Sequence, residues 1–287
     1  MKNNELFKLN EDQLDNNELL SKLDPSRWRE YQAHGITTDA LWVSGSSVPK
    51  NSKKFVVPNR PELPKNSSQF HGLWIPEIPY QFITRFTEEG DTVWSVFGGS
   101  GTDYRVSKML NRECIINDIN PIQDYIVYGD SRDFNPGKKV KLALLHPPYH
   151  DIVKYSEDPA DGSNQDNIVD FLKWFRDVLV NVDRYLEDDG YMVIACSNVY
   201  TNSEELEIGL YLFQIAQLMG YTLKSHIIKD FGETKGSEAK NYNINYYRQL
   251  KGGYNNFYGD NVGIFRKRKS KNDIKSIFQE IINTIDI

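Results

Sequence analysis

The sequence predicts an α/β fold, with a mostly parallel sheet and helices on both of its faces. Short apolar runs alternate with helical patterns from Asp91 onward, as in sheets built from strand–helix–strand units. A glycine-rich turn follows the first of these runs, and a His-Pro-Pro-Tyr segment follows another. Because ligands of such sheets bind at the carboxyl ends of the strands, both segments mark a predicted site.

The expected elements follow in order along the chain. We predict strands over 92–97, 114–119, 140–145, 191–196, 221–228 and 262–265, with a further short strand ending at Asp130. Helices are predicted over 104–110, 168–186 and 204–218, and the one over 168–186 has apolar residues at 3.6-residue spacing. A final amphipathic helix, from Ile274 to Ile285, is expected to pack on the body, with a partner or dimer contact as the alternative.

Three parts of the chain differ in composition. Residues 1–64 are predicted to be a partly irregular extension that could contact DNA, with a short polar helical patch over 12–23 and a stretch rich in Pro, Ser, Asn and Lys at 48–68. Residues 65–269 are predicted to form the catalytic domain, and 270–287 the terminal helix.

Composition excludes several classes of protein. The 287 residues are 39% hydrophobic and 26% charged, enough for one sizeable core. A net charge of −6 argues against a protein that coats nucleic acid, although an enzyme can still meet DNA on one face. No apolar run approaches the roughly 18 residues of a membrane span, and the start has no signal-peptide pattern, so a soluble, cytoplasmic protein is expected. Two cysteines are too few for a disulfide framework or a Cys-rich zinc site.

The glycine-rich turn, residues 97–102, lies between a predicted strand and a predicted helix. Glycines there let the backbone approach a ligand closely. No Lys follows them, so the turn is not a phosphate-binding Walker loop. Asp118 ends the next strand, where an acid can bind ribose hydroxyls, and Asp130 is placed to accept from an adenine amino group. Together these features favour a cofactor that contains adenosine.

The segment His146-Pro147-Pro148-Tyr149 follows the predicted strand over 140–145. Two consecutive prolines remove two backbone donors and stiffen the loop, which leaves its carbonyl groups able to accept hydrogen bonds. A rigid turn after a buried strand is the alternative. We interpret the segment as a chemical one, because folding alone does not call for two prolines and a tyrosine there.

Taken in order, these motifs resemble those of the amino-group DNA methyltransferases, which methylate N6 of adenine or N4 of cytosine with S-adenosylmethionine. Members carry an (Asp/Asn/Ser)-Pro-Pro-(Tyr/Phe) motif and a glycine motif of the form Asp-Pro-Phe-x-Gly-Ser-Gly-Thr. This chain reads Ser-Val-Phe-Gly-Gly-Ser-Gly-Thr at 95–102 and Asp-Ile-Asn-Pro at 118–121. Residues 70–91 are similar to the family's segment around the methionine end of the cofactor, and TTDALW at 37–42 to a lead-in. The resemblance covers roughly residues 37–267.

The resemblance implies a Rossmann-like class I methyltransferase with a mostly parallel seven-stranded sheet, and S-adenosyl-L-methionine as its cofactor. The implied cofactor-binding residues are Pro76, Phe97, Gly99, Ser100, Gly101, Thr102, Asp118, Ile119 and Asp130. The implied catalytic residues are His146, Pro147, Pro148 and Tyr149. No metal is expected, since His150 and the acids at 157–161 lack ligand spacing.

The expected chemistry needs acceptors aimed at an amine. An exocyclic amine is a poor nucleophile because its lone pair is conjugated into the ring. In the resembled family, the first side chain of the motif and the carbonyl of the first proline accept its N–H groups. Tyr149 would stack on a base flipped out of the duplex.

Two departures from the family pattern stand at the predicted site. His146 replaces the usual Asp, Asn or Ser, and only neutral imidazole can accept an N–H bond, so we expect turnover to fall below about pH 6.5. Ser95-Val96 replaces Asp-Pro, which removes a carboxylate near the methionine end of the cofactor. Glu77 is a candidate to replace that carboxylate.

Target recognition must come from short segments. The stretch between Asn120 and His146 is too short for a recognition domain, which leaves 25–65, the loop 150–166 or the segment 232–260. The last interleaves aromatics with Arg248 and Lys251, as a DNA-facing loop does, although an ordinary connecting loop fits equally. The loop 150–166 is interpreted as a mobile lip over the target base. A short target, or a restriction or specificity partner protein, is implied.

The sequence therefore predicts a site-specific DNA methyltransferase, either an orphan or part of a restriction-modification or defence system. Adenine N6 is favoured over cytosine N4 as the target. One alternative is an enzyme that methylates an RNA or protein amine. Another is a catalytically degenerate subunit that binds the cofactor and associates with DNA, which Ser95 and His146 would support. The oligomeric state is left open.

Overall fold

The computed structural model describes residues 36, 40–43, 61, 72, 74–201, 204–230, 247, 249–253, 259–268 and 270–285. The helical patch expected over 12–23 lies outside these residues. So do nearly all of the stretch 48–68 and most of the segment 232–260.

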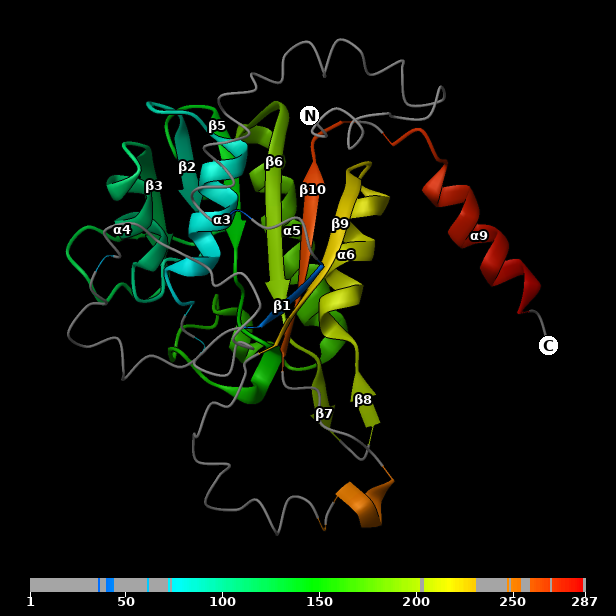
Figure 1. Ribbon diagram of the computed structural model, residues 1–287. Coiled ribbons are helices and arrows are strands. Elements are labelled where there is room, and N and C mark those ends of the chain that lie inside the picture. The colour runs from blue at the N-terminus through cyan, green and yellow to red at the C-terminus, as the bar shows by residue number, and fades with distance from the viewer. Residues whose placement is uncertain are drawn as a thin grey trace, which may run out of the picture.

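An eight-stranded sheet forms the centre of the molecule (Figure 1). Its strands, in spatial order, are β1 (Leu41–Val43), β9 (Thr222–Asp230), β10 (Gly259–Arg266), β6 (Leu186–Cys196), β5 (Val140–Leu145), β2 (Thr92–Ser95), β3 (Glu113–Asp118) and β4 (Val127–Tyr128). In this sheet β10 is antiparallel to β6 and β9, and the other neighbouring pairs are parallel. The predicted mostly parallel α/β class is confirmed. Seven of the strands are the expected ones, and β1 adds an eighth from the segment predicted to be an extension.

Helices cover both faces of the sheet, as the alternation of buried side chains along the strands requires. On β5, Ala143 and Leu145 face the core formed with α5 (Ile168–Tyr185) and α6 (Ile208–Leu218). Leu142 and Leu144 face the opposite core, formed with α3 (Glu77–Phe86) and α4 (Thr102–Met109). Burying each such leucine contributes about 1.5–3 kcal/mol.

The strand order reverses between β2 and β5. The chain runs outward from β2 through β3 to β4, and then returns to place β5 on the other side of β2. Ligands of open α/β sheets bind at such a reversal, beyond the carboxyl ends of the strands. The glycine turn follows β2 and the His-Pro-Pro-Tyr segment follows β5, so the topology brings these two segments together.

The predicted helix over 204–218 is too long at its start. Residues Glu204–Leu206 form β8, which pairs with β7 (Val199–Thr201) in a two-stranded antiparallel ribbon. The backbone groups of these residues are used in that pairing, and α6 begins only at Ile208. The strand β6 starts at Leu186, five residues before the predicted start.

The terminal helix α9 (Ile274–Thr284) forms as predicted, with Asp273 capping its start through the backbone N–H of Ser276. It does not bury its apolar stripe against the described residues, so the expected packing on the body is wrong. Ile277 is 49% exposed and Ile282 60% exposed. Figure 1 shows α9, in red, projecting beside α6 and away from the sheet.

No helix among the described residues combines the length and apolar character that crossing a membrane would need.

Candidate active site

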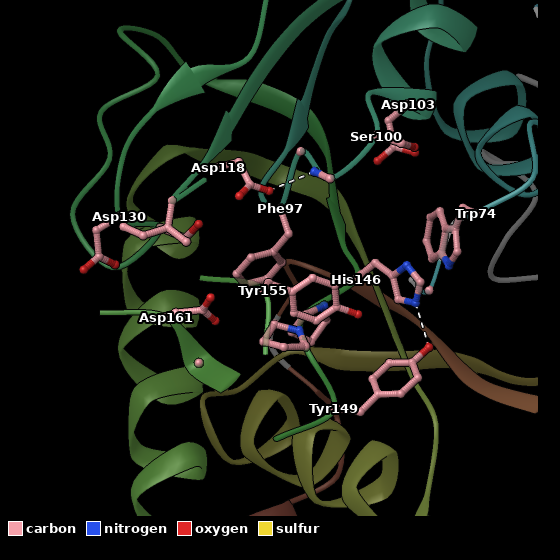
Figure 2. Close-up of a pocket in the computed structure, with 18 of the residues that line it drawn as sticks. Trp74, Phe97, Ser100, Asp103, Asp118, Asp130, His146, Tyr149, Tyr155 and Asp161 are labelled. Atoms are coloured by element: carbon pink, nitrogen blue, oxygen red, sulfur yellow. Dashed lines mark hydrogen bonds between the residues drawn. The ribbon is translucent and has the colours of Figure 1, made fainter. Parts of the chain in front are cut away.

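A cavity lies where the carboxyl ends of β2, β3 and β5 meet (Figure 2). Its empty volume is about 870 Å³, part of which is open to solvent. The glycine turn, Asp118 and the His-Pro-Pro-Tyr segment all contribute to its wall. The three segments singled out in the sequence therefore share one site.

All but two of the predicted site residues line this cavity. Those that do are Phe97, Gly99, Ser100, Thr102, Asp118, Ile119, Asp130, His146, Pro147, Pro148 and Tyr149. The two that do not are Gly101, the residue before the first turn of α4, and Pro76, which precedes α3 and is buried. Their predicted contacts with the cofactor have no counterpart in the cavity wall.

The glycine turn has a backbone that other residues disfavour. Gly99 and Gly101 have φ of 48° and 83°, in the left-handed region. A Cβ at Gly101 would lie 2.3 Å from the Tyr125 hydroxyl oxygen, and one at Gly98 would lie 2.9 Å from Ile126. Gly98 and Gly101 are therefore required by packing inside the protein, and they shape the turn before any ligand arrives.

Asp118 ties the glycine turn to the end of β3. One carboxylate oxygen accepts from the backbone N–H of Gly99 and the other from that of Asn120, both at 2.8 Å. Burial raises the pKa of Asp118, while these two backbone donors act in the opposite direction. The carboxylate faces the cavity with acceptor capacity left, as an acid that binds hydroxyl groups needs.

Asp130 also lines the cavity, at the end away from Trp74 (Figure 2). It is already engaged by Arg132, whose guanidinium donates to both carboxylate oxygens, the shortest contact being 2.6 Å. The pKa of Arg132 is raised mainly by this hydrogen bond to Asp130. Asp130 can thus reach a ligand only as one member of an ion pair, which the sequence did not indicate.

A buried carboxylate stands close to the position where the family's Asp is missing. Ser95, at the end of β2, donates a hydrogen bond of 2.8 Å to Asp103, in the first turn of α4. Asp103 is 9% exposed and lines the cavity, and burial raises its pKa to about 6. Glu77, the expected substitute, begins α3 and is absent from the cavity wall. Asp103 is therefore the carboxylate that the cavity offers here.

His146 lies against Trp74, with their rings stacked at a centroid distance of 4.8 Å and an angle of 26°. The pKa of His146 is lowered to about 4, mainly by burial, while the charge of Asp260 raises it and that of Lys229 lowers it. The expectation that His146 titrates near pH 6.5 is therefore wrong, because the ring is partly enclosed by the protein. At neutral pH it is the uncharged imidazole, which can accept a hydrogen bond.

His146 is the first member of a chain of hydrogen bonds that leads away from the cavity. Its Nε2 lies 2.7 Å from the Tyr149 hydroxyl, which donates to Asp260 at 2.6 Å (Figure 2 shows the first contact). Asp260 in turn accepts from Lys229 at 2.9 Å, in an ion pair whose side chains are 1% and 6% exposed. Tyr149 is thus fixed at its hydroxyl, and its ring orientation is set by residues of β9 and β10.

The loop 150–166, predicted to be a mobile lip, is held by a dense set of hydrogen bonds. Asp161 accepts from the backbone and hydroxyl of Ser163 and from the Ser156 hydroxyl, all at 2.8 Å. Trp174 of α5 donates to the Ala160 carbonyl at 2.9 Å. These contacts fix the loop as a wall of the cavity.

In the described part of the chain, no three His, Cys, Asp or Glu side chains gather as a metal site.

Several residues of the site were missed from the sequence. Trp74, Asp103, Tyr155, Asp161 and Trp174 line the cavity. Asp260 and Lys229 join it through Tyr149. Asp103 had a signal, since it directly follows the glycine turn. The buried ion pair had none, because its residues are far apart in the sequence and only the pairing of β9 with β10 brings them together.

Two of the segments expected to recognise a target fall largely outside the described residues. Of 232–260, the structure describes 247, 249–253 and 259–260, and Tyr247 and Leu250 there are 67% and 65% exposed. Of 25–65, it describes 36, 40–43 and 61. The expected contacts of both segments with DNA stay predictions.

A family model described as DNA methylase matches residues 140–280. This range begins with β5 and takes in the His-Pro-Pro-Tyr segment, β9 and β10. A comparison with curated protein sequences finds no match.

Solved structures that resemble the chain are distant. TrmN from Thermus thermophilus is 13% identical over 71% of this chain and 52% of its own, with a TM-score of 0.45, so the chain spans about half of that protein. A TehB-like SAM-dependent methyltransferase from Corynebacterium glutamicum is 14% identical over 88% of this chain and 100% of its own, with a TM-score of 0.40. The N-methyltransferase NodS from Bradyrhizobium japonicum is 11% identical over 65% and 84%, with a TM-score of 0.37. None of the three is close enough to carry a functional conclusion.

Proposed function

We propose that this chain is an amino-group DNA methyltransferase, the family whose model matches residues 140–280, and that it methylates the exocyclic amine of a base in DNA. S-adenosylmethionine is the methyl donor. Adenine N6 is the favoured target and cytosine N4 the alternative. The observation that carries the proposal is the meeting of the glycine turn, Asp118 and the His-Pro-Pro-Tyr segment around one cavity.

The residues around the cavity fit S-adenosylmethionine in their chemistry. Figure 2 places Asp118 and Asp130 toward one end, and Asp103 and Trp74 toward the other, with His146 on the side of Trp74. Asp118 suits the ribose hydroxyls, which donate hydrogen bonds. Asp103 suits the ammonium of the methionine portion, because a buried carboxylate gains a counter-charge there. When bound, the cofactor supplies an electrophilic methyl group on its sulfonium.

The His-Pro-Pro-Tyr segment supplies what the target amine needs. His146 Nδ1 and the Pro147 carbonyl are acceptors for its two N–H bonds, and accepting both makes the nitrogen lone pair available for attack. The Tyr149 ring, fixed through its hydroxyl, offers a surface on which a flipped base can stack. Holding the amine in place in this way supplies a large part of the rate acceleration.

Two features support an active enzyme over a degenerate subunit. The carboxylate lost at Ser95 is replaced in the cavity by Asp103. The burial that lowers the pKa of His146 to about 4 keeps the imidazole uncharged, and so able to accept, across the physiological pH range. Target recognition would then come from the segments 25–65 and 232–260, or from a partner protein.

The test is nucleoside mass spectrometry on unmethylated DNA incubated with the full chain and S-adenosylmethionine. N6-methyladenine or N4-methylcytosine in the digest supports the proposal and names the base. The His146→Ala variant should lose about 10²–10⁴-fold in rate, as expected when an acid–base group is removed. It should keep its affinity for S-adenosylhomocysteine. RNA and a protein extract are treated in parallel, and methylation confined to either of them would overturn DNA as the substrate.

A further inference from the structure

His146 begins a hydrogen-bonded chain of four side chains from three strands: His146 and Tyr149 follow β5, Asp260 lies on β10, and Lys229 lies on β9. Lys229 on β9 lies directly opposite Asp260 on β10 in the antiparallel register. Asp260 uses one oxygen for Lys229 and the other for the Tyr149 hydroxyl, and Tyr149 meets His146 at Nε2. Tyr149 and His146 flank the two prolines of the motif, so this series of hydrogen bonds ends at the reactive side of the cavity.

The direction of the protons along this chain follows from its fixed end. A carboxylate paired with a buried lysine ammonium is ionised and can only accept. The short contact of 2.6 Å between Asp260 and the Tyr149 oxygen therefore contains the hydroxyl proton of Tyr149. With that proton committed, the Tyr149 oxygen can only accept from His146, whose Nε2 must carry a hydrogen. In the reverse arrangement, two acceptor oxygens would face each other at 2.6 Å.

We propose that Tyr149, Asp260 and Lys229 are positioning residues that hold His146 as the Nε2–H tautomer, so that Nδ1 is the bare acceptor presented to the target amine. The proposal rests on the proposed function for the identity of that amine. The stack on Trp74 fixes the plane of the ring, and the hydrogen bond to Tyr149 fixes its rotation. An Asp or Asn in this position needs no such device, because its side-chain oxygen accepts without a choice of tautomer.

The same arrangement gives the released proton a destination. If the amine nitrogen forms a bond to the methyl carbon of the donor, the bond from that carbon to the donor sulfur breaks and its electron pair stays on the sulfur. The amine nitrogen then carries a positive charge and must lose one proton. That proton passes to the lone pair of His146 Nδ1, and the electron pair of the broken N–H bond returns to the amine nitrogen. The resulting imidazolium keeps its Nε2–H bond to Tyr149, beyond which the Asp260 carboxylate supplies a nearby negative charge.

The tautomer can be measured without cofactor or DNA. Protein labelled with ¹⁵N-histidine is recorded by long-range ¹H–¹⁵N correlation at pH 7, and the His146 signals are assigned by their absence in His146→Asn. We expect a protonated Nε2 and a bare Nδ1. A bare Nε2 with a protonated Nδ1 in the wild-type protein would overturn the proposal, whatever the methylation assay gives.

The Tyr149→Phe variant tests the positioning role. It removes the acceptor of the Nε2 proton, so the spectrum should shift toward a mixture of tautomers. We expect kcat to fall about 10–100-fold, the range found when partners that orient metal-binding histidines are removed. Affinity for S-adenosylhomocysteine should stay the same. An unchanged tautomer would contradict the proposal, and so would an unchanged kcat.

A matched control is Tyr221→Phe. Tyr221 is 3% exposed and donates to the Asp183 carboxylate at 2.8 Å, but it does not line the cavity. The same atom is removed from a similar hydrogen bond, and neither the His146 spectrum nor kcat should change.

For the ion pair, the double variant Lys229→Met/Asp260→Leu avoids leaving one buried charge alone, and it should change the tautomer as Tyr149→Phe does. A wild-type spectrum with protonated Nε2 but no methylated DNA would reject the proposed function and leave the positioning network standing.

Discussion

The Ser95 hydroxyl donates to the Asp103 carboxylate at 2.8 Å, across the base of the glycine turn. In the resembled family a carboxylate comes from the strand itself, at the position of Ser95. In this chain the strand supplies the donor, and the carboxylate comes from the first turn of the following helix. The two residues have exchanged roles, and the cavity keeps its negative charge.

Replacing Asp103 with Asn should weaken cofactor binding. We expect the affinity for S-adenosylhomocysteine to fall about tenfold or more, the value of a hydrogen bond to a charged group. Because burial raises the pKa of Asp103 to about 6, wild-type affinity should also decline as the pH falls below 6 and the carboxylate is neutralised. Isothermal titration calorimetry between pH 5 and 8 measures both effects.

Two further variants show whether Asp103 is the cause. Ser95→Ala removes a donor that lowers the pKa of Asp103, so the decline in affinity should begin at a higher pH. Asp188→Asn, an exposed residue of β6, removes a charge elsewhere and should change nothing. Equal affinities for Asp103→Asn and the wild-type protein would exclude the proposed contact.

The partly enclosed imidazole of His146 should make stability depend on pH. Between pH 6.5 and about 4 the unfolded chain protonates this side chain and the native protein does not, since the pKa of His146 is lowered to about 4. The unfolded state then binds more protons, so the free energy of unfolding falls as the pH drops through that window. Relative to His146→Asn, the wild-type protein should lose stability from pH 7 to pH 4.5 in urea denaturation.

Asp103 provides an internal check, because its sign is opposite. Its native pKa of about 6 lies above its ordinary value, so the native state binds the extra proton between about pH 4 and 6. Relative to Asp103→Asn, the free energy of unfolding of the wild-type protein should therefore increase as the pH falls from about 6 to 4. Two curves with the same slope would show that one of the two side chains is not buried as described.

The sequence predicted the architecture and the cavity because both depend on local patterns. Apolar periodicity located α5, and alternation of strands with helices implied the parallel sheet that brings the glycine turn, Asp118 and His146 together. The predicted start of α6 was wrong because pairing of β7 with β8 overrides the helical pattern at Glu204–Leu206. Local propensity cannot weigh such a contact.

The chemistry of the site was harder to predict. Motif matching identified His146, but we expected an ordinary pKa for it. The stacking on Trp74 and the hydrogen bond to Tyr149 depend on tertiary packing, which the motif does not describe. The pair Lys229–Asp260 has no sequence signal, because an isolated Lys and Asp are usually exposed. These are tertiary effects, and one sequence carries no direct record of them.

Gly101 should be the least replaceable residue of the glycine turn. Gly101→Ala places a Cβ at positive φ, which costs about 1–2 kcal/mol, and within 2.3 Å of the Tyr125 hydroxyl oxygen, which adds about 1–3 kcal/mol of overpacking. We expect the melting temperature to fall accordingly in a thermal unfolding experiment followed by circular dichroism.

Gly137→Ala is the matched control. Gly137 has φ of 78°, close to that of Gly101, but a Cβ there would meet no atom within 4 Å. It should carry only the backbone cost, so the difference between the two variants isolates the contact with Tyr125. If both variants lowered the melting temperature equally, the close packing of Tyr125 against the turn would be contradicted.

Deleting residues 271–287 should leave the fold nearly as stable as before. α9 has no buried residue, and its side chains Ile277, Ile281 and Ile282, together with Ile285 directly after it, are about half exposed or more. Removing exposed groups changes the free energy of unfolding by only about 0.5 kcal/mol, so urea denaturation should give nearly the same midpoint. Fluorescence of a hydrophobic dye should decrease, because the deletion removes the largest run of exposed isoleucines among the described residues.

Phe171→Ala provides the contrast for that deletion. Phe171 is fully buried on α5, and its truncation should cost about 3–5 kcal/mol. A deletion that lowered the midpoint as much as Phe171→Ala, with no loss of dye binding, would mean that the isoleucines of α9 are covered in solution. Measuring the midpoint at two protein concentrations would then identify the cover, since a contact between two copies of the chain strengthens with concentration and a contact within one copy does not.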